Sequence, residues 1–265
     1  MGYWQDRLIK AQDVISNKTI RQIEKQLTKY YQEVGKNVID EFENTYNKLL
    51  ATIEDGKEPT PADLYKLDKY WELQAQTRQK LRELGEKEVS LLTKYFELDF
   101  FDIYYSIDIE GLTTFNTLDE AAVQQMINGI WVADAKTWSD RIWKNTEYLL
   151  ETLNEQLIHT VATGKKPTEL KKLLQERFSV SYQQADTLVR TEVSHIQTVA
   201  AEKRYKDYGL EQYEYLGRDQ HEKELKCKCK ELNGKKFFYH DPSAPRPPLH
   251  PNCRCSIIPV VEIEI

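Results

Sequence analysis

Apolar residues recur every three or four positions over much of the first part of the chain. The clearest stripe lies between Asn17 and Thr52, on Ile20, Ile23, Leu27, Tyr30, Val34, Val38, Phe42, Tyr46 and Leu49. This spacing places the apolar side chains on one face of a helix and leaves Lys, Glu and Gln on the other. We therefore predict a long amphipathic helix over residues 17–52. It either binds a partner or, as we favour, forms half of a helical hairpin.

A second helix is predicted after a break at Asp55-Gly56. Thr60 precedes Pro61 and Asp63, which is the order of an N-cap, a first helical residue and the acidic third residue of a capping box. Apolar positions continue this helix as a long, partly solvated arm to Val89.

Aromatic residues then crowd between Phe96 and Phe115. This segment indicates a short strand, an aromatic docking surface or, as we favour, a core segment that joins the arm to the body. A short helix is predicted over residues 117–131.

The pattern predicts three further helices before residue 209. Thr137 and Asp140 resemble a capping box, and apolar positions behind them continue a helix to Gly164. Pro167 starts a short helix, and Ser181 with Gln184 resembles a second capping box that opens the last one. After Gly209, alternating residues predict short strands at 213–216, 236–239 and 256–260. The proline-rich stretch 241–248 predicts a stiff loop.

The predicted fold is mainly α with a small C-terminal α+β module. Long N-terminal helical arms over residues 1–116 precede a compact C-terminal domain over residues 117–265. That domain has a helical part, residues 133–208, and a module rich in cysteine and histidine, residues 209–260.

The amino-acid composition and net charge exclude several classes of protein. Lys and Arg number 37 against 43 Asp and Glu, a formal net charge of −6, which excludes a protein that coats nucleic acid through bulk positive charge. The 10 Gly and 9 Pro are few, which favours long helices over barrels and glycine-rich nucleotide folds. The sequence has no secretory signal and no apolar stretch of membrane-spanning length, so we expect synthesis in the cytoplasm and no membrane association.

All four cysteines lie near the end of the chain, as the pairs Cys227/Cys229 and Cys253/Cys255. Two short pairs joined by a loop are a common way to close a tetrahedral zinc site. We predict a structural zinc bound by Cys227, Cys229, His250 and Cys253. Cys255 is an alternative to Cys253, and His240 is a further candidate.

Two disulfides or four free thiols are the alternatives to a metal. A reducing cytoplasm disfavours disulfides. The module has few apolar residues and needs a cross-link to fold, which favours a metal or a disulfide over free thiols. We therefore describe the C-terminal domain as zinc-stapled.

Other polar residues in this part of the chain have less specific roles. Arg190 and Glu192 stand two apart on a predicted helix, and we assign them a structural role at the junction between helix and module. Five lysines surround the first cysteine pair and form a basic patch that contacts a partner or nucleic acid, or is simply solvated: Lys226, Lys228, Lys230, Lys235 and Lys236. The motifs of zinc peptidases, serine hydrolases, phosphate-binding loops and zinc deaminases are absent, so we assign no catalytic residue and expect no enzyme activity.

Four groups of residues occur in an order that resembles a known family. They are Trp138-Ser139-Asp140-Arg141-Ile142-Trp143, Leu188-Val189-Arg190-Thr191-Glu192, the Cys227/Cys229 pair with Leu232-Asn233-Gly234, and His250-Pro251-Asn252-Cys253-Arg254-Cys255. Together they resemble the phage Mu protein F-like minor head proteins, or head morphogenesis proteins, of tailed phages. The family usually has C-x-x-C in the first pair, whereas this chain has Lys226 where the first cysteine belongs.

The resemblance implies a minor capsid protein of the virion, made in the host cytoplasm and placed inside the capsid near the portal vertex. The implied partners are the portal protein and also the scaffold or major capsid protein, and the implied role is procapsid assembly and DNA packaging or delivery. The alternative is a zinc-stapled nucleic-acid-binding protein that contacts the packaged genome weakly through the lysine patch.

Overall fold

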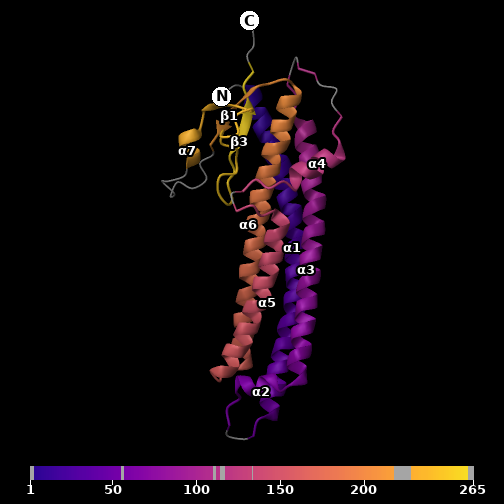
Figure 1. Cartoon of the computed structure of the whole chain (residues 1–265), viewed down its shortest axis with the longest axis vertical. Helices are drawn as coiled ribbons and strands as arrows, with labels where there is room; N and C mark the ends of the chain where they lie inside the picture. Colours follow the sequence, from indigo (N-terminus) through magenta and orange to yellow (C-terminus); the bar gives the residue numbers. More distant parts are fainter. Residues whose placement is uncertain are drawn as a thin grey trace. The chain divides into compact units, whose positions relative to one another are not determined.

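The computed structural model describes residues 3–54, 57–109, 112–113, 117–132, 134–217 and 228–261 (Figure 1). Its helices are α1 (Tyr3–Thr52), α2 (Pro61–Tyr65), α3 (Asp68–Ser106), α4 (Glu120–Ile127), α5 (Trp138–Ala162), α6 (Pro167–Asp207) and α7 (Lys228–Leu232). Its strands are β1 (Gln212–Leu216), β2 (Lys236–Phe238) and β3 (Ser256–Pro259). The predicted fold class, mainly α with a small C-terminal α+β module, is confirmed. Among the described helices, none is apolar over a membrane-spanning length.

The helices run further than the sequence pattern predicts. α1 begins near the N-terminus rather than at residue 17, and α3 continues to Ser106, so the strand alternative for the aromatic segment is wrong. The helix start predicted at Ser181 is also wrong, because α6 is continuous from Pro167 to Asp207. No Gly or further Pro interrupts α6, and the Ser181 hydroxyl donates to Asn145 Oδ1 at 3.2 Å instead of capping a helix.

Several local predictions are confirmed. Thr60 and Asp63 form a reciprocal capping box at the start of α2. That helix ends at Tyr65, however, and α3 starts afresh at Asp68, so the predicted arm is two helices. The three C-terminal strands occur where alternation predicts them.

The contacts divide the chain into two compact units. Unit 1 comprises residues 1–23, 92–138 and 187–265, and unit 2 comprises residues 24–91 and 139–186. Each unit draws on residues from both sides of position 116. Independent folding of residues 117–265 as a domain therefore stays a prediction.

Unit 2 packs segments of α1, α3, α5 and α6 side by side around an apolar core (Figure 1). The core residues are each at most 2% exposed and include Leu27, Phe42, Leu49, Leu81, Leu84, Leu149, Leu153, Leu157, Leu170 and Leu174. Gly85 permits a close approach of α3 and α5, since a Cβ there would lie 2.8 Å from the Trp143 ring.

A buried polar layer interrupts this core, with one residue from each helix. Asn145 Nδ2 donates to Tyr31 OH at 3.3 Å and to the Ser181 carbonyl at 3.1 Å. Glu88 is 1% exposed and hydrogen-bonds to Tyr31. Burial raises the pKa of Glu88 from 4.5 to about 8, although the bond to Tyr31 opposes part of this rise.

We expect Glu88→Gln to stabilise the protein at neutral pH. As pH rises from 4.5 to 8, the unfolded chain releases the Glu88 proton that the folded chain retains, so the wild type loses stability over this range. The glutamine does not titrate, and we expect a gain of about 3 kcal/mol at pH 7. Urea unfolding at pH 5 and pH 8 measures this. Equal pH dependence in the two proteins would show that Glu88 ionises freely.

Unit 1 combines helical segments with the sheet. The strand order is β2-β1-β3 with both pairings antiparallel, so β1 is central. The β1 residues Tyr213 and Tyr215 are fully buried. A buried polar cluster joins α1 to α6, in which Gln12 donates to Tyr205 OH at 3.4 Å and Gln197 donates to Gln12 Oε1 at 3.2 Å.

Candidate metal centre

Three of the four cysteines cluster around Tyr215 of β1 in unit 1. Cys229 comes from α7, and Cys253 and Cys255 from the segment that leads into β3. The three are each at most 3% exposed, and their Sγ atoms all lie within 4.8 Å of one another. The fully buried Tyr215 lies against them and donates its hydroxyl hydrogen to Cys229 Sγ at 3.3 Å.

Two glycines permit this arrangement. Gly234 has φ +77° and donates its N–H to the Tyr215 carbonyl at 2.8 Å, which fixes the turn between α7 and β2. Gly217 ends β1 directly beside α7, where its N–H donates to Asn233 Oδ1 at 3.0 Å. A Cβ at Gly217 would lie 2.4 Å from the Cys229 carbonyl oxygen, so any side chain here would push α7 and its cysteine away.

Gly217→Ala is therefore expected to disrupt the cysteine cluster. The clash is with backbone, which cannot rotate away, and we expect a loss of about 2 kcal/mol or more in unfolding free energy. Thermal melting and metal content measure the effect. Gly209→Ala is a control that strains the backbone without a clash, because Gly209 has φ +77° and a Cβ there meets nothing within 4 Å. The prediction fails if the two variants behave alike.

The sulfur geometry fits a tetrahedral metal. Sγ of Cys229 and Sγ of Cys253 are 3.9 Å apart. Two thiolates on one zinc lie about 3.8 Å apart, given a zinc–sulfur bond of about 2.3 Å, whereas a disulfide requires about 2.05 Å. Hydrogen bonding to Cys255 and burial raise the pKa of Cys253. A bound cation would offset this cost, because it stabilises the thiolate form.

The structure does not place Cys227 or His250 in this cluster. Cys227 lies outside the described residues. His250 is partly exposed, and its Nδ1 lies 2.9 Å from the Pro251 carbonyl oxygen. Among the described residues, the group of donors within 4.8 Å contains the three cysteines and not His250.

Cys255 joins Cys253 in the cluster rather than replacing it. His240 is exposed and packs against Phe238. The fourth ligand stays a prediction.

The α6 motif around Arg190 and Glu192 lies at the junction with the cysteine module. Between them, Thr191 Oγ1 accepts the backbone N–H of Asn252 at 3.1 Å and so holds the loop that carries Cys253. Glu192 is 3% exposed and accepts the Trp131 indole N–H at 3.1 Å. These contacts agree with a structural role for Glu192, and Thr191 is a contact that the sequence did not predict.

A histidine on α6 also lies at this junction. His195 stacks on Trp131, with ring centroids 4.3 Å apart. Burial lowers the pKa of His195 to about 3, so the ring is neutral in the folded protein.

The predicted basic patch is exposed. Lys228 and Lys230 lie on α7, Lys235 directly precedes β2, and Lys236 is its first residue. Lys226 lies outside the described residues. Phe238 follows on the edge strand β2, is 43% exposed, and lies 5.1 Å from the His240 ring, centroid to centroid.

Arg246 ties the proline-rich loop to α6. Its Nε and Nη2 donate to the two Glu202 carboxylate oxygens at 2.6 and 3.3 Å. Its remaining N–H groups donate to the carbonyls of Tyr239, Asp241 and Ala244. The partners are far apart in the sequence, so no local pattern indicates this contact.

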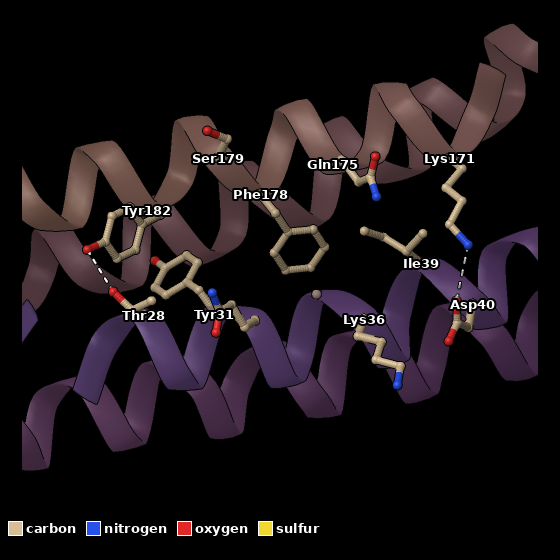
Figure 2. A pocket seen from close by; sticks show the side chains of 12 residues that line it. Thr28, Tyr31, Lys36, Ile39, Asp40, Lys171, Gln175, Phe178, Ser179 and Tyr182 are labelled. Carbon is tan, nitrogen blue, oxygen red and sulfur yellow. Dashed lines mark hydrogen bonds and ion pairs between the residues drawn. The ribbon is translucent and has the colours of Figure 1, made fainter. Parts of the chain in front are cut away.

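Unit 2 contains a groove of 560 Å³ between α1 and α6. Figure 2 shows Phe178 lying between Tyr31 and Ile39, with Lys171 directed at Asp40. Tyr31, Ile39 and Phe178 are each only 6% exposed. These three side chains are therefore largely buried within the packing of unit 2.

Comparison with known proteins gives a family match over part of the chain. Residues 151–258 match the family described as Phage Mu protein F like protein. No curated protein and no solved structure gives a match. The matching region runs from within α5 to within β3 and includes the three clustered cysteines. The chain therefore carries a phage Mu protein F-like domain, which confirms the resemblance that its motifs indicate.

Proposed function

We propose that this protein is a minor head protein at the portal vertex, where it binds the portal protein and supports procapsid assembly and genome packaging or delivery. The observation that carries the proposal is the match of residues 151–258 to a phage head morphogenesis family. In this role the protein is a structural component of the virion and not an enzyme.

The cysteine cluster supports a zinc-stapled module within this protein. Cys229, Cys253 and Cys255 supply three thiolates with suitable spacing, and Cys227 or His250 supplies the fourth ligand. Four protein ligands close the site to substrate, so the metal contributes folding free energy rather than catalysis. The scaffold and major capsid proteins are further candidate partners.

Co-purification tests the portal proposal. We expect the full chain, co-expressed with the portal protein of the same phage, to co-elute with it in size-exclusion chromatography at physiological salt. A folded chain that elutes apart from both monomeric and assembled portal protein would refute the proposal. The major capsid protein alone serves as the comparison, because a vertex component has to prefer the portal.

A second candidate function is contact with the genome, and one observation favours it. Phe238 and His240 present paired rings close in sequence to Lys235 and Lys236. Aromatic side chains stack on unpaired bases while lysines contact phosphates. We expect Lys235→Ala with Lys236→Ala to weaken binding of a single-stranded oligonucleotide and reduce its salt dependence. Lys29→Ala is the control on a different surface. Absence of binding at low salt would exclude this function.

A further inference from the structure

The aromatic segment of α3 has a buried side and an exposed side. Phe100 and Tyr104 are fully buried and stack with centroids 6.5 Å apart. Tyr104 also donates its hydroxyl hydrogen to Asp207 on α6 at 2.6 Å. This half of the segment forms part of the core of unit 1, which agrees with the interpretation we favoured from the sequence.

The exposed side carries a second stacked pair. The planes of the partly exposed Phe101 ring and the exposed Tyr105 ring are nearly parallel, at an angle of 10° and with centroids 6.3 Å apart. Each ring also contacts a buried ring edge to face, Phe101 on Phe100 and Tyr105 on Tyr104. The core therefore holds both rings in place, and they would lose little side-chain entropy on binding a partner.

These rings belong to a longer apolar stripe. Leu98, Phe101 and Tyr105 follow one another at steps of three and four residues, so they lie on one face of the helix. Leu98 is 47% exposed and Tyr105 is 59% exposed. Large apolar side chains that stand together in solvent mark an interaction surface more often than isolated ones do.

Acidic residues border this stripe on both sides. By helical spacing, Asp102 flanks one edge and Glu97 the other, and the exposed Asp108 follows the end of the helix at Ser106. Within the described part of the chain none of the three forms an ion pair. Lys94, the nearest basic residue along α3, lies over the Tyr95 ring at 5.9 Å, and Arg204 of α6 lies over the Tyr104 ring at 4.8 Å.

We propose that Leu98, Phe101 and Tyr105 form a docking stripe for a basic amphipathic helix of another protein. Such a helix would place apolar residues at matching steps against the stripe and Lys or Arg against the acidic borders. A second copy of this chain fits poorly, because it would bring acidic borders together. The chemistry of the stripe defines this partner, whether or not the protein binds the portal.

Peptide binding to the full chain tests the docking stripe. The probe is a fluorescent helical peptide with Leu at heptad positions a and d and Lys at e and g, and the matched peptide carries Glu in place of Lys. We expect the basic peptide to bind at about micromolar concentration and the acidic peptide at least tenfold more weakly. Leu98→Gln with Tyr105→Gln should weaken binding of the basic peptide by at least tenfold.

Two further variants separate apolar from electrostatic contributions. Glu97→Gln, Asp102→Asn and Asp108→Asn together should weaken binding and reduce its salt dependence, and should leave folding intact because none of the three residues is buried. Tyr148→Gln is the matched control, since Tyr148 is 51% exposed on α5 and should leave binding unchanged.

Several outcomes would overturn the proposal. It fails if both peptides bind equally, if the Leu98 and Tyr105 changes have no more effect than Tyr148→Gln, or if neither peptide binds. Self-association in analytical ultracentrifugation that the same double substitution abolishes would assign the stripe to a second copy instead.

Discussion

Replacing Cys253 with serine is expected to remove the bound metal and unfold the C-terminal module. Cys253 is 1% exposed and lies between the other two clustered thiols in the sequence motif. Structural zinc contributes about 10–16 kcal/mol to small modules that fold around it, so the loss of one ligand should remove several kcal/mol. Metal analysis of the reduced protein should give one zinc per wild-type chain and much less in the variant.

Thermal melting completes this test. Chelation of the wild type should lower the melting temperature toward that of Cys253→Ser, and zinc should restore it in the wild type alone. Arg254→Ala is the matched control, because Arg254 lies between Cys253 and Cys255, is exposed, and cannot bind zinc. Freshly reduced wild-type protein without zinc, or a Cys253→Ser protein with normal zinc and stability, would refute the metal site.

The same assay identifies the fourth ligand. Cys227→Ser and His250→Ala should differ: the true ligand should lower zinc content and stability, and the other should change neither. Cys229→Ser and Cys255→Ser should both resemble Cys253→Ser, since all three sulfurs belong to the cluster.

Local sequence signals predicted those helix starts and strands whose formation depends on interactions between residues close in sequence. The Thr60 capping box and the three C-terminal strands depend on neighbouring residues, and each occurs as predicted. Ser181 failed because its hydroxyl bonds to Asn145 on another helix, and that tertiary contact replaces the cap. At the end of α2, the Trp71 indole N–H donates to the Tyr65 carbonyl at 3.0 Å, a contact that the apolar pattern does not encode.

The candidate site was predictable in composition but not in arrangement. The clustering of cysteines near the C-terminus indicated a metal, yet the sequence could not show that Cys253 and Cys255 both point to Cys229. Nor could it show Thr191 binding the Asn252 loop, since 61 residues separate them. Such contacts depend on how α6 and the sheet pack, which spacing along the chain does not specify.

Arg246→Ala is expected to be the most destabilising change outside the cysteines. It removes a bidentate bond to Glu202, whose side chain is 13% exposed, and leaves three backbone carbonyls without their donor. Removing one partner of a partly buried, hydrogen-bonded charge pair costs about 3 kcal/mol or more. Lys206 Nζ lies 2.6 Å from Glu202 and should offset part of this loss.

A series of variants separates charge from geometry at this position. Arg246→Lys keeps the charge, but an ammonium group cannot form the bidentate bond to Glu202 and the bonds to the loop carbonyls at once. The free energy of unfolding should therefore fall nearly as much as in Arg246→Ala. Adding Glu202→Gln to Arg246→Ala should then lower the free energy of unfolding only slightly further, because the two residues stabilise the protein through their shared contact. Arg254→Ala again serves as control. Urea unfolding measures each free energy. Wild-type stability in Arg246→Lys would show that charge alone matters, and wild-type stability in Arg246→Ala would show that the loop is held by its prolines rather than by this arginine.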